Sequence, residues 1–290
     1  MNYFWLGLAL GVLLAIPLVV VFSRRTADRV RELEKRANSS DRLAEQAMLT
    51  GGLAHEIKNP LSSINLNIQL LQEDLTDLRR SGPTAAATTG QTADDKLGRI
   101  QRRFESLGRE TQRLRTILED FLRFAGRMKL ELVPTDVNAM LSEVVDFFQP
   151  QAQSMGVTIR NQLSHGPLLV QADEGLLKQA ILNLMINACQ AMAGAREKNT
   201  PNGGASELMV QTARRRSVQG DVMDIHITDT GPGIAAEDQA KIFQPYYSTK
   251  KGGTGLGLPT SRRIVEEHRG SLRVHSELGK GSDFVVTLPV

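Results

Sequence analysis

The sequence contains little cysteine and few aromatic residues, and each shortage excludes a class of fold. Its 290 residues include one cysteine, Cys189, which excludes disulfide bonds within the chain and fits a reducing compartment. Aromatic residues make up 4% of the chain, which favours long helices over a β-sandwich. The 35 basic and 32 acidic residues are interspersed without a basic stripe, so we expect no direct binding of nucleic acid.

Charged residues are absent from Tyr3 to Phe22, a run long enough to cross the roughly 30 Å hydrocarbon core of a membrane as a helix. Arginines follow this run directly, and the positive-inside rule then places the rest of the chain in the cytoplasm. A cleaved signal peptide is the alternative, but no basic region precedes the run and no A-x-A site follows it. We therefore expect residues 1–23 to be a single-pass anchor in the inner (plasma) membrane, and residues 24–42 to be a signalling-helix linker.

Two later stretches have apolar or small residues at every third or fourth position, which is the spacing of a helix that packs along one face. The first stretch runs from Leu33 to Leu78 and the second from Leu97 to Met128. The segment between them is rich in Gly, Thr, Ala and Pro and has no such repeat, so it is expected to be a loop. A hairpin of this length is expected to associate with a second copy into a four-helix bundle. The sequence thus predicts a homodimer with a helical-hairpin domain over residues 43–130.

A histidine with chemically useful neighbours lies in the first helical stretch, within HEIKNP. His55 follows a residue of the apolar seam, so we expect it to be exposed, and a large share of such a histidine is neutral near pH 7. Glu56 can hold one ring N–H or accept the proton that leaves when the other nitrogen attacks phosphorus. Asn59, one helical turn further on, can orient a water molecule. By position alone, solvated helical side chains without a chemical role are the alternative.

From about residue 131 onward the pattern changes to mixed helices and strands. Helices are expected over residues 137–152 and 175–192, and the last strands look like neighbours in hairpins. The expected strands are residues 157–160, 168–173, 207–212, 223–229, 271–276 and 283–288. This order predicts an α+β sandwich of helices on one mixed sheet over residues 131–290.

Two clusters in this region carry polar groups suited to a nucleotide and its metal ion. Asn183 and Asn187 share one helical face, and their amide oxygens suit a hard Mg²⁺ ion that keeps several waters. Asp229 ends a strand and is followed by Gly231 and Gly233, which permit a tight turn and close approach of the backbone to a flat ligand. Its carboxylate can accept a hydrogen bond from the exocyclic amine of adenine. Solvated amides and an ordinary Gly-Pro turn are the alternatives.

Two further clusters follow. In IFQPYYSTK, Phe243 and Tyr246 can anchor a mobile lid by packing and Lys250 can meet phosphate charge, although a loop pinned by aromatic residues is the alternative. A glycine-rich segment then runs into a helical pattern and exposes backbone N–H groups to anionic oxygens. It lacks the GK[ST] ending of a P-loop and does not follow a strand as a Rossmann fingerprint does. Its candidate binding residues are Gly253, Thr254, Gly255, Leu256 and Gly257.

In order and content these segments resemble the sensor histidine kinases of two-component systems. HEIKNPL resembles the phospho-acceptor box of that family, NLMINA the N box, DTGPGI the G1 box, IFQPYYSTK the F box and GGTGLGL the G2 box. The resemblance covers about residues 43–290. The segments NACQAM and STKKGGTGLGL are most similar to the nitrogen-regulation subgroup.

The resemblance implies a GHKL/Bergerat-type ATP-binding domain and a role for each box. It implies that His55 is phosphorylated from ATP, that Glu56 is the general base and that Asn59 serves a phosphatase activity. It also implies that Asn187 binds Mg²⁺ with help from Asn183, that Asp229 recognises adenine, and that the glycine-rich segment holds the triphosphate under a flexible lid.

The resemblance also implies a partner, because histidine kinases pass the phosphoryl group on to an aspartate. Since the final strand is followed by no receiver domain here, the acceptor is expected on a separate response regulator. Many relatives carry a basic residue where Gln190 stands, and Lys250 is the expected substitute for the contact to the terminal phosphate. A catalytically inactive ATP-binding scaffold or switch in the same signalling complex is the alternative function.

Overall fold

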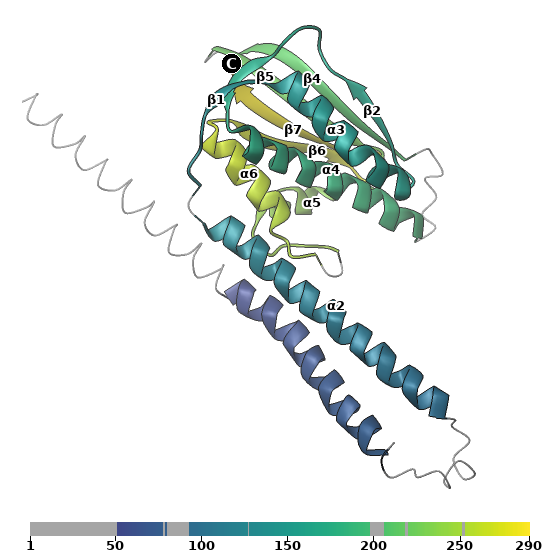
Figure 1. The fold of residues 1–290 in the computed structure, drawn as a ribbon. Helices are drawn as coiled ribbons and strands as arrows, with labels where there is room; N and C mark the ends of the chain where they lie inside the picture. The colour runs from purple at the N-terminus through teal and green to yellow at the C-terminus, as the bar shows by residue number, and fades with distance from the viewer. Residues whose placement is uncertain are drawn as a thin grey trace, which may run out of the picture. The chain divides into compact units, whose positions relative to one another are not determined.

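The structure is a computed structural model that describes residues 51–77, 79, 93–126, 128–197, 206–217, 220–250 and 253–290 (Figure 1). The predicted membrane anchor and linker lie outside these residues. Within the described residues, no helix is both long enough and apolar enough to span a bilayer. Residues Leu53–Val290 form one compact unit, which the following description concerns.

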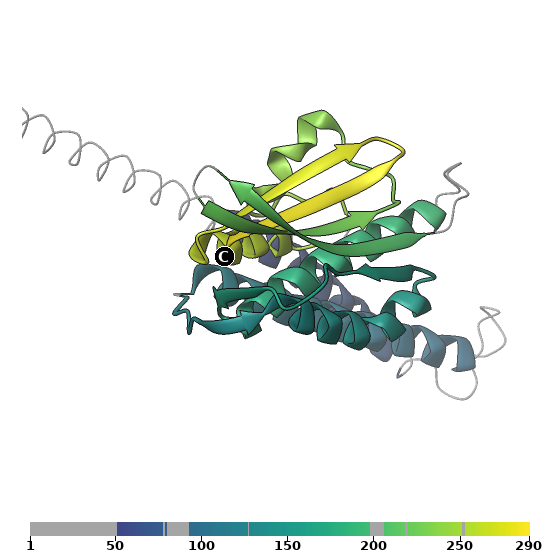
Figure 2. The same ribbon diagram turned by 90° about the horizontal axis from the view of Figure 1, so that it is seen from above.

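A helical hairpin forms the first part of this unit. Its first helix, here called the His55 helix, covers residues 51–77, and its second is α2 (Ala93–Ala125). The two helices lie side by side (Figures 1 and 2), and Arg103 of α2 donates a 2.7 Å hydrogen bond to Asp74 of the His55 helix. The predicted hairpin is therefore confirmed, although α2 ends at Ala125, before Met128.

The apolar seam of the hairpin is covered only in part by the single chain. Leu71 and Ile117 are buried, but other seam residues are exposed, because one hairpin can cover only one side of each helix. The large apolar members of the predicted seam that are exposed are Leu61, Ile68, Leu75, Leu97, Phe104 and Leu118. These side chains are the surface that the predicted second copy would cover.

The rest of the unit is built on a five-stranded sheet with the order β2-β4-β5-β7-β6 and a separate two-stranded sheet, β1-β3. β2 pairs with β4 in parallel, and the other pairs in both sheets are antiparallel. The strands are β1 (Val133–Asp136), β2 (Thr158–Gln162), β3 (Leu169–Ala172), β4 (Glu207–Ser217), β5 (Gly220–Asp229), β6 (Ser271–Glu277) and β7 (Gly281–Pro289).

Helices α3 (Val137–Ser154), α4 (Glu174–Glu197) and α6 (Gly257–Glu267) cover one face of the five-stranded sheet (Figure 2). The core between these layers includes Phe148, Leu184 and Ile225, each fully buried. Two short elements, α5 (Ala236–Gln239) and η2 (Lys241–Phe243), precede the glycine-rich segment. The predicted α+β sandwich is confirmed, but the strand expected over residues 168–173 pairs with β1 in the separate sheet and does not join the mixed sheet.

Side-chain caps fix the starts of the two longest helices of the sandwich. Asp136 accepts hydrogen bonds from the backbone N–H groups of Asn138 and Leu168, which begins α3 and ties it to the chain before β3. Asp173 accepts from the backbone N–H of Leu176 in the first turn of α4. Its second oxygen accepts from the backbone N–H of Glu131. The start of α4 is thereby linked to the segment that follows the hairpin.

Candidate nucleotide and phosphotransfer site

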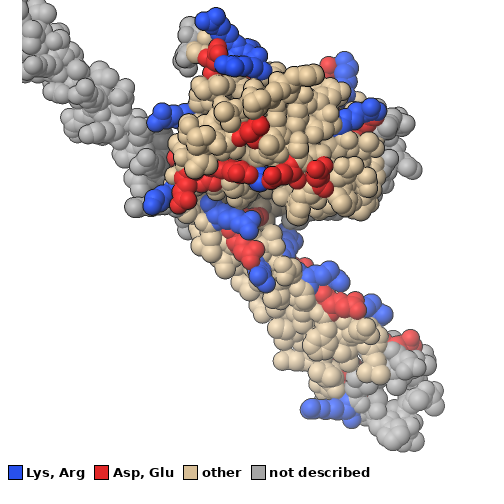
Figure 3. Space-filling model, turned by 45° about the horizontal axis from the view of Figure 1, so that its top comes forward, with Lys and Arg blue, Asp and Glu red and all other residues tan. Residues whose placement is uncertain are grey.

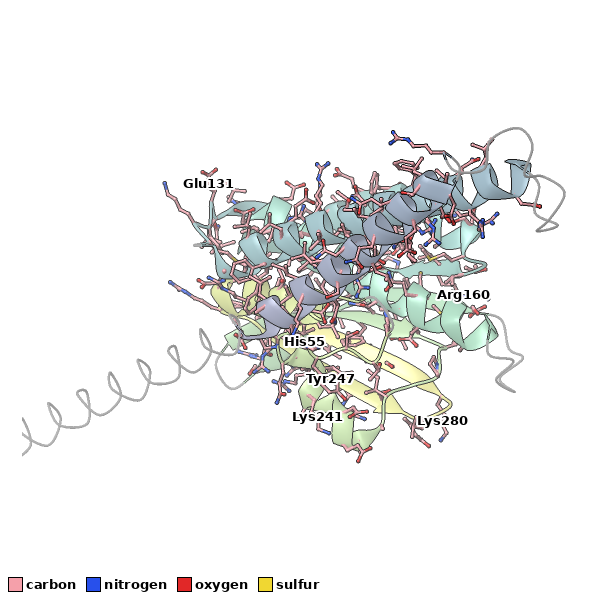
Figure 4. All side chains as sticks on the ribbon, turned by 90° about the horizontal axis from the view of Figure 1, so that it is seen from below. His55, Glu131, Arg160, Lys241, Tyr247 and Lys280 are labelled. Carbon is pink, nitrogen blue, oxygen red and sulfur yellow. The ribbon has the colours of Figure 1, made fainter. Side chains whose placement is uncertain are left out.

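The phospho-acceptor candidates lie near the beginning of the His55 helix. His55 is exposed, as expected from its place beside the seam, and Figure 4 shows it near one end of that helix. Glu56 is half-buried, and its Oε2 atom lies 3.7 Å from Nη2 of Arg113 on α2. Asn59 is exposed one turn after His55. The histidine is therefore accessible to a phosphate donor, while the carboxylate beside it is held near a cation.

The two asparagines of α4 lie on its side opposite the core. Leu184 and Ala188, which alternate with them along the helix, are almost fully buried, whereas Asn183 and Asn187 are half-buried. The helix thus leaves both amides outside its buried face, and Asn187 lies beside Lys250 and Gly257.

The ammonium group of Lys250 is hydrogen-bonded to oxygen atoms of Asn187 and Gln190. The Nζ atom of Lys250 lies 3.1 Å from Asn187 Oδ1, 3.2 Å from the backbone oxygen of Asn187 and 3.1 Å from Oε1 of Gln190. Oxygen atoms of this kind are the ligands that Mg²⁺ prefers, so the residues present fit the expected metal ion. Lys250 thus lies directly against Gln190, the position at which many relatives carry a basic residue. Contact of Lys250 with a phosphate stays a prediction.

The electrostatic surroundings of Lys250 and Asp229 perturb both side chains. Burial lowers the pKa of Lys250 to about 8, and the negative charge of Asp229 opposes that shift. Burial raises the pKa of Asp229 to about 6, and hydrogen bonds from the backbone of Gly231 and Ser282 oppose it, as does the charge of Lys250. Side chains whose pKa values are shifted by burial and by a charged partner cluster at functional sites, so this pair supports such a role.

Asp229 is 4% exposed at the end of β5, where the chain turns sharply. The backbone N–H of Gly231 donates a 2.8 Å hydrogen bond to its Oδ1 atom. A Cβ atom at Gly231 would lie 2.6 Å from that oxygen, and one at Gly233, whose φ is +72°, would lie 2.1 Å from the backbone oxygen of Glu277. Gly231 is therefore required by the carboxylate beside it, and Gly233 by the backbone at the end of β6. Gly281 of β7, which sequence reasoning did not select, is equally crowded against the backbone of Asp229.

The aromatic and glycine-rich segments pack directly on each other. The backbone N–H of Tyr246 donates a 3.1 Å hydrogen bond to the oxygen of Gly255. A Cβ atom at Gly255 would lie 2.6 Å from the carbonyl carbon of Tyr246. Phe243 is half-buried and lies under the guanidinium group of Arg262, 5.5 Å from the ring centroid. Phe243 therefore packs against the core and Arg262, whereas its role as the anchor of a mobile lid stays a prediction.

The glycine-rich segment reaches both α4 and the hairpin. Gly257 begins α6, and a Cβ atom there would lie 3.7 Å from the side-chain nitrogen of Asn187, while Leu256 is fully buried. Gly253 is exposed, and a Cβ atom there would lie 2.8 Å from the hydroxyl of Ser248. Thr254 donates a 2.9 Å hydrogen bond to Asp120 of α2. The segment is thus placed between Asn187 and the phosphotransfer hairpin.

Arg263 of α6 makes a second connection to the end of α2. Its guanidinium group donates to the backbone oxygens of Phe124 and Gly126 and lies 5.9 Å from the centroid of the Phe124 ring. Sequence reasoning did not select Asp120 or Arg263. Both lie outside the recognisable boxes, and only the apolar repeat around Asp120 marked it as part of a helix.

Comparisons with known proteins agree with this arrangement. Residues 45–127 match the His Kinase A (phospho-acceptor) domain, and residues 172–290 match the histidine kinase-, DNA gyrase B- and HSP90-like ATPase family. The signal transduction histidine-protein kinase AtoS of Escherichia coli (strain K12) is 31% identical over 95% of this chain and 40% of its own length. The sensor histidine kinase ZraS of the same organism is 32% identical over 96% of this chain and 53% of its own. The chain therefore spans about half the length of these relatives.

Solved structures have the same fold. The crystal structure of full-length ShkA in complex with AMPPNP has a TM-score of 0.54 and 25% identity over 84% of this chain and 45% of ShkA. The histidine kinase ThkA, solved in complex with the response regulator protein TrrA, has a TM-score of 0.60 and 23% identity over 86% of this chain and 63% of that one. With a phospho-acceptor hairpin and a histidine kinase-like ATPase domain in one chain, this protein belongs to the sensor histidine kinases of two-component systems, in their nitrogen-regulation-like group.

Proposed function

We propose that this chain transfers the terminal phosphoryl group of ATP to His55 and then to an aspartate of a separate response regulator. The observation that carries the proposal is an exposed histidine with an adjacent half-buried carboxylate, in the same compact unit as an ATPase-type site built around Asp229. Relatives that are about 30% identical are named histidine kinases, which agrees with this reaction.

In the first step, one neutral ring nitrogen of His55 attacks the terminal phosphorus of ATP. The N–P bond forms, the bond from phosphorus to the bridging oxygen breaks, and ADP leaves. Glu56 accepts the proton that the imidazole loses. The Nη2 atom of Arg113, 3.7 Å from Oε2 of Glu56, holds the carboxylate near the histidine.

The nucleotide is held by the groups gathered between α4 and α6. Asp229 accepts a hydrogen bond from the amine of adenine, and Gly231 and Gly233 let the backbone approach the ring. The triphosphate is bound by the glycine-rich segment at the start of α6, where free N–H groups attract anions. Asn187, with Asn183, holds Mg²⁺, which neutralises phosphate charge when it is bound. Lys250 then leaves the oxygens of Asn187 and Gln190 for the terminal phosphate.

Two copies of the chain form the working unit. The exposed apolar side chains of the seam would be covered in a four-helix bundle. Figure 3 shows charged side chains gathered along one edge of the hairpin, with uncharged surface beside them. The uncharged run from Tyr3 to Phe22 anchors each copy in the inner membrane with its catalytic part in the cytoplasm. Asn59, exposed beside His55, orients the water that removes the phosphoryl group from the regulator in a phosphatase reaction.

The experiment that tests the proposal is incubation of the full chain, in detergent micelles, with radiolabelled ATP and Mg²⁺. We expect acid-labile, base-stable label on the wild type and none on His55→Gln or Asn187→Ala. His165→Gln, which changes another exposed histidine, is the matched control and should label normally. Equal labelling of His55→Gln, or ATP binding without any label on the wild type, would contradict phosphotransfer and favour an ATP-dependent switch or scaffold.

A further inference from the structure

The ammonium group of Lys250 is bonded to the same residue that is proposed to hold Mg²⁺. Its Nζ atom lies 3.1 Å from Asn187 Oδ1 and 3.2 Å from the backbone oxygen of Asn187. A third hydrogen bond, 3.1 Å long, joins Nζ to Oε1 of Gln190, which lies about one turn further along α4. An ammonium group has three N–H donors, so these three contacts use all of them.

The side-chain amide of Asn187 is oriented by its neighbours on two sides. Its oxygen faces Lys250, which can only donate hydrogen bonds. Its nitrogen faces the start of α6, where a Cβ atom at Gly257 would lie 3.7 Å away. Asn187 and Lys250 are both half-buried, so their contact is partly shielded from water. A metal ion bound by this side chain would need the same Oδ1 atom, because the amide nitrogen is a hydrogen-bond donor only.

Lys250 and a divalent cation therefore compete for one oxygen atom. Mg²⁺ holds its ligands at about 2.0 to 2.1 Å, so an ion on Asn187 Oδ1 would lie at most about 5 Å from the Nζ atom in its present position. Like charges at such a separation repel each other strongly where they are shielded from water. Lys250 must leave α4 before a metal ion can bind well at Asn187.

A phosphate group offers Lys250 a stronger partner than α4 does. The three acceptors on α4 are neutral amide oxygens, and hydrogen bonds to an ionised acceptor are about twice as strong as those between neutral groups. The long, flexible stem of lysine lets the ammonium group reach a new acceptor while the backbone stays in place. In the proposed function this acceptor is the terminal phosphate of ATP, a group that ADP lacks.

We propose that Lys250 is a specificity-determining residue that makes metal binding at Asn187 depend on the terminal phosphate of the nucleotide. With ATP, the terminal phosphate draws Lys250 away and leaves Asn187 Oδ1 free for the metal ion. With ADP, Lys250 stays on Asn187 and opposes the ion, so the product is held less tightly than the substrate. This inference rests on the proposed function, because it takes ATP to bind beside Asn187.

The test measures the affinity of the full chain, in detergent micelles, for fluorescent analogues of ATP and ADP, each with Mg²⁺ or with EDTA. In the wild type we expect Mg²⁺ to strengthen binding of the ATP analogue by about tenfold or more and that of the ADP analogue by less than about twofold. Lys250→Met keeps an unbranched side chain and removes the charge. In this variant Mg²⁺ should strengthen binding of the ADP analogue by at least about fivefold, although the ATP analogue binds more weakly than to the wild type.

Lys241→Met is the matched control, because Lys241 is exposed and pairs with Asp238, and it should respond to Mg²⁺ as the wild type does. Equal strengthening of ATP and ADP binding by Mg²⁺ in the wild type would overturn the inference, and this comparison needs no variant. A Lys250→Met variant in which ADP still gains nothing from Mg²⁺ would overturn it as well. In either case the proposed function stands as long as the wild type binds ATP. If the wild type binds neither nucleotide, the proposed function itself fails.

Discussion

Thr254 donates a 2.9 Å hydrogen bond to Asp120, and this contact joins the glycine-rich segment to α2 of the phosphotransfer hairpin. The same threonine oxygen accepts a 3.4 Å hydrogen bond from the backbone N–H of Leu256, at the start of α6. Thr254 is one of the residues proposed to bind the triphosphate. The Thr254 hydroxyl must break its hydrogen bond to Asp120 before it can donate to a phosphate oxygen. The contact with α2 therefore competes with nucleotide binding.

Asp120→Ala should therefore increase the apparent affinity for ATP. Loss of the competing hydrogen bond frees Thr254, and we expect KM for ATP to fall by about two- to fivefold in autophosphorylation assays, which corresponds to one modest hydrogen bond. Glu119→Ala is the matched control, since Glu119 is exposed and pairs only with Arg115 in the described contacts. A higher KM in Asp120→Ala would mean that Asp120 holds Thr254 in its binding position instead of competing for it.

Lys250→Ala should have the opposite effect on ATP. Because this ammonium group is proposed to meet the terminal phosphate, its removal should raise KM by about tenfold. The wild type should also bind ATP more weakly as the pH rises through about 8, where Lys250 loses its charge, and the variant should lack this loss.

Lys241→Ala is the control for Lys250→Ala, because Lys241 is exposed and pairs with Asp238. Nucleotide affinity can be measured by titration with a fluorescent ATP analogue at several pH values. If Lys250→Ala binds nucleotide as tightly as the wild type, Lys250 serves only to occupy the oxygens of Asn187 and Gln190 when nucleotide is absent.

The helices and the central strands could be predicted from the sequence because each buries one face, so that apolar residues recur along it at the helical or strand period. α3 begins at Val137 as expected, while α4 extends to Glu197, five residues past the expected end, because no breaker follows Met192 directly. β1 was not predicted, since its four residues, Val133–Asp136, include a proline and are held only by pairing with β3. Such short edge strands depend on tertiary contacts that no local pattern records.

The nucleotide site was largely predictable, whereas its contacts with the hairpin were not. Asp229, Gly231 and Gly233 were found because close packing at this turn requires glycine, which appears in the sequence as a Gly-Pro-Gly segment. Asp120 is a single acid on a helix with many charged residues, and only the fold brings it to Thr254. The same holds for the link from Arg263 to the end of α2, which joins residues far apart in the sequence.

Asn59→Ala should separate the two activities proposed for the phosphotransfer helix. Asn59 is exposed one turn after His55 and is proposed to orient water, a role that autophosphorylation does not need. We expect release of phosphate from the phosphorylated regulator to fall by at least about tenfold while His55 is labelled at the wild-type rate. Lys58→Ala, at the adjacent exposed position, should change neither rate. Loss of labelling in Asn59→Ala would assign the amide to the kinase step.

Asp229→Asn should stabilise the nucleotide-free protein and abolish tight ATP binding. The folded-state pKa of Asp229, about 6, lies above the ordinary aspartate value of 3.8, so its protonated form favours folding below about pH 4. This contribution is lost as the pH rises through about 6, and by neutral pH the buried charge costs on the order of 2 to 3 kcal/mol. Asparagine stays neutral and avoids that cost.

The gain in stability from Asp229→Asn should therefore be small near pH 4 and several degrees in Tm at pH 7.5. ATP affinity should fall by about 30-fold or more, because the asparagine oxygen will face the N–H of Gly231 and leave its amide group against the adenine amine. Thermal unfolding of the full chain with and without ATP at both pH values measures the two effects together. A variant that is less stable at pH 7.5, or that ATP still stabilises fully, would mean that the carboxylate is retained for the fold and does not recognise adenine.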